Sequence, residues 1–132
     1  MNCDVADATD LSGYEDRFDT VVDSALYHCL DDEARQAYIA ALYRVTRPGA
    51  RLHLSCFSDG NVNGVIAPTG NVPESNLRDT LTANGWRIDF LGPTTYLGNA
   101  VGFRSGCRSA RRRSSVPAVH GRARAPRRLD LT

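Results

Sequence analysis

The stretch from Phe18 to Phe57 constrains the fold of this chain more than any other part of it. It holds two short apolar runs with a helical pattern between them. Phe18–Asp23 is about six residues long and contains Phe18, Val21 and Val22, which favours a strand over a helix. Arg51–Phe57 alternates leucine with His53 and Ser55, and this alternation predicts a second strand.

A helix is predicted between these two strands. Asp31 or Asp32 can cap its amino end, and Pro48-Gly49 stops it and turns the chain. Arg35, Gln36 and Arg44 fall outside its apolar stripe. The stripe itself has helical spacing and consists of Ala34, Ala37, Tyr38, Ala41, Leu42 and Val45. A helix that connects two strands implies that the strands are parallel and the crossover right-handed.

The flanking segments predict further elements of the same α/β class. In chain order they are a loop at Thr9–Asp16, a long loop rich in Gly and Asn at Ser58–Val72, a helix from Pro73-Glu74 to Gly85, a half-buried strand at Trp86–Leu91, a turn at Gly92-Pro93 and a final strand at Tyr96–Phe103.

The composition changes abruptly after Phe103. Residues 1–103 hold seven arginines and fourteen acidic residues, whereas residues 104–132 hold nine arginines and one acidic residue. The second segment has no periodic apolar face, so we expect it to be disordered. The sequence therefore predicts one domain over residues 1–103, followed by an Arg-rich tail over residues 104–132.

Bulk properties exclude several classes of protein. The length of 132 residues suits one modest domain, and no apolar run approaches the ~20 residues of a membrane span. The start does not have the pattern of a secretory signal. The four cysteines form no C-x-x-C pair, so we expect free thiols in a cytoplasmic protein and no metal site.

Four segments together resemble a known family. They are ADAT at 6–9, FDTVVDSALYHCL at 18–30, RPGARLHLSCF at 47–57 and GWRIDFLGP at 85–93. Their order and spacing resemble the C-terminal half of a class I S-adenosylmethionine-dependent methyltransferase. The nearest type is the bacterial thiopurine/tellurite group, which acts on small molecules.

The resemblance implies part of a Rossmann-like sheet with the family order 3-2-1-4-5-7-6, in which strand 7 is antiparallel. It makes Cys3–Ala6 the end of strand 3, and it makes Phe18–Asp23 and Arg51–Phe57 strands 4 and 5. Trp86–Leu91 and Tyr96–Phe103 then become strands 6 and 7.

The resemblance also implies site residues, each of which has a structural alternative. Asp7 and Ala8 would contact the adenine of S-adenosylmethionine, or they are turn residues. Asp23 and Ser24 would line the methyl-donor pocket, or they cap the following turn. Tyr27 and His28 would lie on the substrate side, and His28 is the one catalytic candidate, or it packs inside the protein.

The sequence departs from the family at its amino end. It lacks the Gly-rich loop after strand 1 and the acidic residue after strand 2, which hold the cofactor in related folds. Strands 1 and 2 should lie between strands 3 and 4, so strand 4 would be an unpaired apolar edge. We therefore expect a truncated and impaired enzyme.

Three functions follow from these observations. The first is methyl transfer from S-adenosylmethionine to a small molecule. The second is a non-catalytic remnant or partner subunit that acts through a homodimer or a complementing chain. The third, which we favour least, is nucleic-acid binding by the tail, whose arginines have no aromatic residues between them to stack on bases. The tail also lacks an apolar face to insert into a membrane, and a frame shift in the gene would explain its composition.

Overall fold

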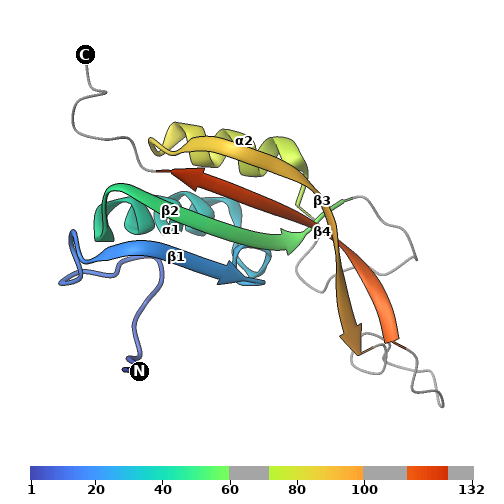
Figure 1. Ribbon diagram of the computed structural model, residues 1–132, viewed down its shortest axis with the longest axis horizontal. Coiled ribbons are helices and arrows are strands. Elements are labelled where there is room, and N and C mark those ends of the chain that lie inside the picture. The colour runs from blue at the N-terminus through green and yellow to red at the C-terminus, as the bar shows by residue number, and fades with distance from the viewer. Residues whose placement is uncertain (60–71, 100–112, 125–132) are drawn as a thin grey trace.

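The computed structural model describes residues 1–59, 72–99 and 113–124. Four strands form one sheet in the order β1-β2-β4-β3, with two α-helices and a short 3-10 helix (Figure 1). The elements are β1 (Phe18–Ser24), η1 (Tyr27–Cys29), α1 (Asp32–Val45), β2 (Thr46–Phe57), α2 (Glu74–Ala83), β3 (Arg87–Asn99) and β4 (Arg113–Arg124).

The predicted strand–helix–strand unit is confirmed. β1 and β2 are parallel and α1 connects them. Asp31 caps α1, because its carboxylate accepts a hydrogen bond of 2.8 Å from the backbone N–H of Ala34. The helix ends at Val45, and the pairing of β1 with β2 is irregular at the start of β2. Gly49 has a φ of 86°, a backbone conformation that glycine adopts without steric cost.

The core lies between the sheet and the two helices. Leu52, Leu54 and Cys56 of β2 are buried with Ile39 and Leu42 of α1 in one cluster. Each fully buried leucine contributes roughly 1.5–3 kcal/mol of transfer free energy. The predicted stripe of α1 is confirmed in its second half but not in its first, where Ala37 is exposed and Arg35 is buried.

The turn after α2 brings Trp86 into this core. Trp86 is buried, and its indole N–H donates a hydrogen bond of 3.3 Å to the carbonyl of Ile39. Its ring meets that of Tyr43 edge to face, with centroids 5.8 Å apart. Gly85 has a φ of 88°, and an added Cβ there would lie 3.1 Å from the Tyr43 ring. The predicted glycine stop of this helix therefore has both a conformational and a steric reason.

The prediction of a turn at Gly92-Pro93 is wrong. β3 runs without a break from Arg87 to Asn99 and includes both residues. A proline lacks the N–H that a central strand needs, but β3 is an edge strand and tolerates it. Residues 96–99 of the predicted final strand are consequently the end of β3, and residues 100–103 lie outside the described part of the chain.

The prediction that the Arg-rich segment is disordered is wrong for residues 113–124. These residues form β4, which pairs antiparallel with β2 on one side and with β3 on the other (Figure 1). Pro117 is paired with Thr95 of β3, beyond the last β2 pair at Ala118, so it does not interrupt the β2 ladder. Backbone hydrogen bonds, which need no apolar pattern, hold this strand in place.

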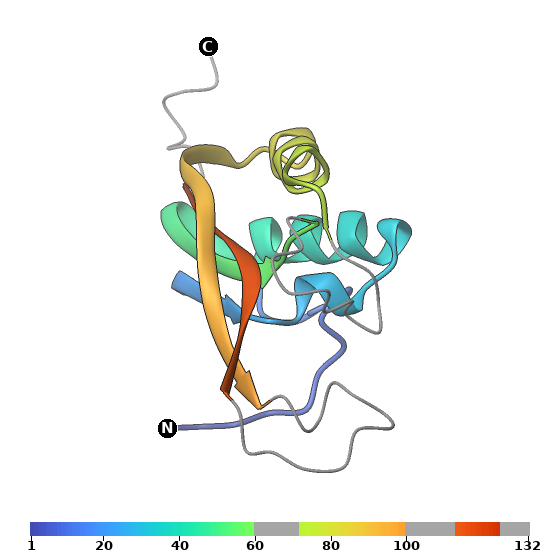
Figure 2. The same cartoon turned by 90° about the vertical axis from the view of Figure 1, so that its right-hand side faces the viewer.

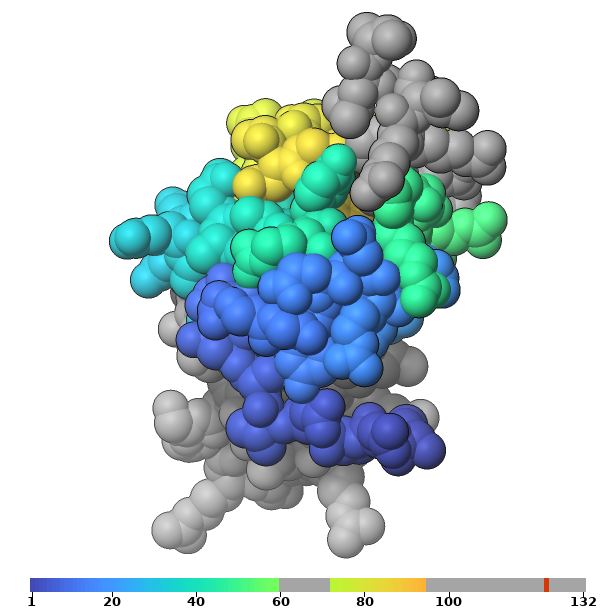
Figure 3. Space-filling model, turned by 90° about the vertical axis from the view of Figure 1, so that its left-hand side faces the viewer, coloured from blue at the N-terminus to red at the C-terminus, as the bar shows by residue number. Residues whose placement is uncertain are grey.

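The prediction that Cys3–Ala6 ends a strand is also wrong, because residues 1–7 contain no helix or strand. The predicted loop at Thr9–Asp16 is confirmed. Its end is held against α1, where the backbone N–H groups of Asp16 and Arg17 donate to the carbonyls of Arg44 and Val45. Figure 3 shows this amino-terminal segment and β1, in blue, lying against the green end of α1.

The predicted loop between β2 and α2 is only partly described. Residues 60–71 lie outside the described part of the chain, and Ser58 and Val72 at its two ends form a parallel bridge. Among the described elements, α1 and α2 lie on the same side of the sheet and no helix lies on the other (Figure 2). No helix in the described ranges is long and apolar enough to cross a membrane.

Candidate functional site

The carboxyl ends of the parallel strands β1 and β2 lie side by side at one end of the sheet. The residues that follow β1 there form the candidate site. Ligands in open α/β folds bind at this edge. Asp23 and Ser24 end β1, and Ala25 and Leu26 connect it to η1, which contains Tyr27 and His28. The structure therefore brings four of the six predicted site residues together.

Asp23 supports the turn after β1 from inside the protein. It is only 4% exposed, and its Oδ1 accepts a hydrogen bond of 2.9 Å from the N–H of Leu26. Its Oδ2 accepts one of 3.1 Å from the hydroxyl of Tyr38 on α1. Burial raises the pKa of Asp23, and these hydrogen bonds oppose that rise. Both oxygens thus have internal partners, which is the arrangement expected of a capping residue.

Ala25 has an unusual backbone conformation that its residue type did not predict. Its φ is 77°, which an L-residue with a Cβ adopts at a cost of roughly 1–2 kcal/mol. Its N–H donates a hydrogen bond of 2.9 Å to the carbonyl of Ser55, which continues the β1–β2 pairing by one residue. The neighbouring Ser24 is exposed. Backbone strain of this kind is concentrated at functional sites.

His28 is held in a neutral form. It is 5% exposed, and its Nδ1 accepts a hydrogen bond of 3.3 Å from the backbone N–H of Phe57. Its ring also stacks on that of Phe57, with centroids 4.1 Å apart. Burial lowers the pKa of His28, and the charge of Arg35 acts in the same direction, whereas Asp23 opposes it. Because Nδ1 is already an acceptor, His28 could act as a base only after leaving this arrangement.

Tyr27 belongs to a ring of polar contacts that joins η1 to both helices. It is fully buried, and its hydroxyl donates a hydrogen bond of 2.9 Å to Oδ1 of Asn76 on α2. Asn76 Nδ2 donates to Asp32 Oδ1 at 3.1 Å, and Arg35 Nη1 donates to the same oxygen at 3.0 Å. Arg35 Nε then donates to the carbonyl of Tyr27 at 3.3 Å.

Arg35 completes this ring by lying over Tyr27, with its guanidinium carbon 5.2 Å from the ring centroid. Its side chain is 10% exposed and that of Asp32 is 82% exposed. The sequence did not predict a role for Arg35, and the one available signal was its i,i+3 spacing from Asp32. A direct contact between Tyr27 and a substrate would require this ring to open.

Asp7 and Ala8 lie in a separate turn before β1. Asp7 is exposed, and its Oδ1 accepts hydrogen bonds from the N–H and the hydroxyl of Thr9, at 2.8 and 2.6 Å. The hydrogen bond from the Thr9 hydroxyl lowers the pKa of Asp7 most, and the hydrogen bond from the Thr9 backbone N–H lowers it further. Ala8 is partly buried against the core. This geometry is that of an Asx turn, and the adenine contact proposed for these two residues stays a prediction.

The thiols and the metal-ligand types do not form a cluster in the described ranges. Cys3, Cys29 and Cys56 are free, and burial raises the pKa of Cys56 to about 12, so this thiol is inert at neutral pH. No group of three or more His, Cys, Asp or Glu residues that could hold a metal ion occurs among the residues that the structure describes.

Comparisons with known proteins identify relatives of this chain. No family model matches it. A 2-heptyl-1-hydroxyquinolin-4(1H)-one methyltransferase from Mycobacteroides abscessus is 32% identical over 103 residues, which are 78% of this chain and 45% of that protein. A solved structure concerned with the conversion of a disulfide bond into a thioacetal group during echinomycin biosynthesis is 31% identical, with a TM-score of 0.74. That match covers 93% of this chain and 56% of the other. This chain is therefore similar in sequence to part of a methyltransferase and to part of the echinomycin-related protein.

Lower-identity structures support the same fold. The Burkholderia thailandensis 1,6-didemethyltoxoflavin-N1-methyltransferase, solved with its substrate and S-adenosylhomocysteine, is 18% identical with a TM-score of 0.59. The match covers 92% of this chain and 49% of that protein. The present chain thus spans about half the length of the quinolone and toxoflavin methyltransferases named above. Residues 1–103 are less than four fifths of the chain, so the 93% match to the echinomycin-related structure includes part of the Arg-rich segment.

Proposed function

We propose that this chain is part of an S-adenosylmethionine-dependent methyltransferase that methylates a small molecule. The similarity to the quinolone methyltransferase carries the proposal, because it is a sequence similarity over most of this chain. By analogy with that relative's named substrate, a small heteroaromatic compound is the acceptor class to test first. We further propose the thiopurine/tellurite subtype and the C-terminal half of the family fold. β1, β2, β4 and β3 would then correspond to family strands 4, 5, 7 and 6.

The residues at the candidate site fit the cofactor only in part. Ser24 and the strained backbone at Ala25 face the edge where a ligand would bind, and Asp7 and Ala8 are the proposed adenine contacts. Asp23, Tyr27 and His28 have internal partners instead. The cofactor supplies an electrophilic methyl group. The proposed contribution of the protein is to hold the acceptor in line with it.

We propose that this chain alone binds S-adenosylmethionine weakly, since none of the four segments that carry the resemblance is the Gly-rich loop that follows strand 1 in the family. Calorimetric titration of the purified chain with S-adenosylmethionine tests this, with the Mycobacteroides abscessus relative as a positive control. Ser24→Arg should abolish the residual binding without lowering the melting temperature, because Ser24 is exposed. Binding as tight as that of the relative would contradict the impairment, and binding unaffected by Ser24→Arg would contradict the site.

A second candidate function is association with another chain. Val22 is 74% exposed on β1, which is an edge strand in the described sheet. An exposed apolar edge favours pairing with another strand, either from a second copy or from a complementing chain. Sedimentation of the chain over a range of concentrations tests this candidate. A well-folded monomer that gains no partner in a lysate pull-down and no activity in reconstitution would contradict it.

A further inference from the structure

His28 carries a buried hydrogen-bond donor that has no partner among the described residues. The residue is 5% exposed, and its Nδ1 accepts the hydrogen bond from the backbone N–H of Phe57. The proton of the neutral ring is therefore on Nε2. No residue in the described ranges accepts a hydrogen bond from that Nε2–H. A buried donor left unpaired costs about 1–3 kcal/mol, and native proteins contain few of them.

Two contacts with Phe57 fix the direction of this donor. The imidazole of His28 stacks on the Phe57 ring, with centroids 4.1 Å apart and planes inclined by 15°. The 3.3 Å hydrogen bond to Nδ1 also keeps the imidazole from turning over, because a turned ring would lose it. A group whose orientation is fixed before a ligand arrives loses little conformational entropy on binding. The Nε2–H is thus a preorganised donor.

The donor lies at the end of the sheet where ligands bind in open α/β folds. Phe57 is the last residue of β2, and η1, which contains His28, begins shortly after the carboxyl end of β1. Between β1 and η1 lies Ala25 with its φ of 77°, and backbone strain of this kind is concentrated at functional sites. The unpaired donor and the strained backbone therefore occur in one short segment.

The charges around His28 leave it a donor and not a base. Burial lowers the pKa of His28 most, the carboxylate of Asp23 opposes this, and the guanidinium of Arg35 acts with burial. Asp23 already accepts hydrogen bonds from Leu26 and Tyr38 through its two oxygens. A neutral ring with Nδ1 occupied can donate from Nε2 but cannot remove a proton from a substrate. It suits a ligand oxygen that needs no base, which is a carbonyl or an ionised hydroxyl.

We propose that the Nε2–H of His28 donates a hydrogen bond to a carbonyl or ionised hydroxyl oxygen of the methyl acceptor, and so selects oxygen-bearing heteroaromatic compounds. This inference rests on the proposed function, because it assigns one contact to the acceptor of that reaction. His28 determines which acceptor binds and removes no proton from it. The contact does not involve the cofactor, so acceptor binding alone tests it.

Two probes with two fused rings each test the donor. 1-Hydroxyquinolin-4(1H)-one carries a carbonyl and a hydroxyl oxygen, whereas naphthalene has no hydrogen-bond acceptor of this kind. Each is titrated into the full chain, whose histidines are isotope-labelled for NMR. The Nε2 resonance of His28 should shift on binding of the quinolone and not of naphthalene, while Nδ1 stays unprotonated. This measurement needs no variant, so it does not depend on how a substitution affects folding.

His28→Asn removes the donor but keeps the contact with Phe57, because the amide oxygen can replace Nδ1 and the shorter side chain does not reach the position of Nε2. It should weaken binding of the quinolone about threefold to tenfold and leave the affinity for naphthalene unchanged. His53→Asn is the matched control, since it makes the same substitution inside β2. It should leave both affinities unchanged.

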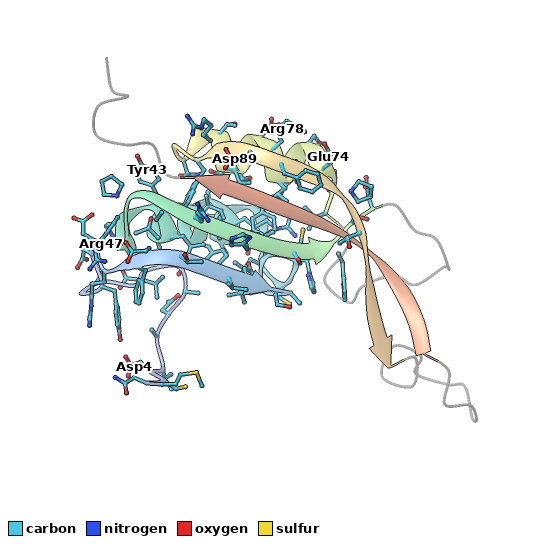
Figure 4. The ribbon with its side chains drawn as sticks, in the orientation of Figure 1. Asp4, Tyr43, Arg47, Glu74, Arg78 and Asp89 are labelled. Atoms are coloured by element: carbon cyan, nitrogen blue, oxygen red, sulfur yellow. The ribbon has the colours of Figure 1, made fainter. Side chains whose placement is uncertain are left out.

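Arg78→Gln separates this contact from a general attraction between cations and an ionised oxygen. Arg78 lies on α2, where its Nη2 is 2.8 Å from Oε1 of Glu74 (Figure 4). Removing this cation should not change the affinity for the quinolone. A loss as large as that in His28→Asn would mean that net charge, and not the His28 donor, holds the oxygen.

Four further results would overturn the inference. They are no shift of the Nε2 resonance with the quinolone, protonation of both His28 nitrogens in the complex, no loss of quinolone affinity in His28→Asn, and an equal loss for both probes in that variant. A chain that binds no S-adenosylmethionine yet shows the selective loss would contradict the proposed activity and leave this inference standing. Cofactor binding without the selective loss would do the reverse.

Discussion

The hydroxyl of Tyr38 donates a hydrogen bond to Oδ2 of Asp23 across 3.1 Å, and both side chains are only 4% exposed. Tyr38 is in the middle of α1, and Asp23 is near the end of β1. The bond therefore connects the helix to the turn that begins the candidate site. Asp23 also accepts a hydrogen bond from the backbone N–H of Leu26, at the start of η1. The position of the whole post-strand segment thus depends on a buried carboxylate.

The first prediction concerns the charge of Asp23. Burial raises the pKa of Asp23 above its ordinary value of 3.8, so ionisation is less favourable in the folded chain than in the unfolded chain. The protonated Asp23 side chain therefore contributes fully to the stability of the fold below pH 3.8, and this contribution is lost as the pH rises through the raised pKa of the folded chain. Asp23→Asn, which does not ionise, should be at least as stable as the wild type at pH 7 in urea denaturation.

Asp23→Ala is the matched variant for this prediction. It leaves the buried hydroxyl of Tyr38 and the N–H of Leu26 without their carboxylate, which costs about 1–3 kcal/mol. Equal losses for the Asn and Ala variants would show that the negative charge itself is needed.

The second prediction concerns pH and His28. Burial lowers the pKa of His28, so the unfolded chain binds a proton near pH 6.5 that the folded chain does not. Stability should fall as the pH decreases below about 6.5. In His28→Asn, the amide oxygen can accept the same hydrogen bond from Phe57 without titrating. Thermal melts at pH 7.5 and 5.5 should show a smaller decrease for this variant, and parallel decreases would contradict the assignment.

The third prediction concerns the backbone of Ala25. Glycine has no Cβ penalty at a φ of 77°, so Ala25→Gly should stabilise the chain by about 0.5–1 kcal/mol in urea denaturation. Ala37→Gly is the control, because Ala37 is exposed on α1 and the same change there should cost about 1 kcal/mol. A loss at Ala25 would mean that the turn relaxes to a negative φ in solution.

The fourth prediction concerns the contact between Tyr27 and Asn76. Tyr27→Phe and Asn76→Ala each remove the 2.9 Å hydrogen bond that connects η1 to α2. A double-mutant cycle should give a coupling of about 0.5–1.5 kcal/mol. Tyr27→Phe combined with Arg78→Ala is the control cycle, and it should be additive. A zero coupling for the first pair would show that the bond contributes nothing in water.

The fifth prediction concerns β4. A chain that ends at Arg112 lacks the strand between β2 and β3 and exposes Leu52 and Ile88, which lie opposite the buried Ala123. We expect it to lose cooperative unfolding and its β-sheet circular dichroism. A chain that ends at Arg124 keeps β4 and serves as the control. A cooperative transition in the shorter chain would support the disordered tail that the sequence predicts.

The sequence by itself determined the elements with strong local signals. The strand–helix–strand unit followed from apolar periodicity. Asp31, one of the two caps predicted for α1, is the residue that caps it, and the predicted glycine stop at Gly85 lies just after the end of α2. Each of these depends on residues close together in the chain, so a window of about fifteen residues contains the cause.

Only the tertiary structure decided the place of the Arg-rich segment, the burial of Arg35 and the internal partners of Asp23 and His28. β4 has little apolar pattern, and the backbone ladders of two distant strands position it. Arg35 is buried because Tyr27 and Asp32 supply an aromatic face and a carboxylate. Such partners come from elements far apart in sequence, and whether a polar side chain faces solvent, a ligand or a buried partner depends on what the fold places beside it.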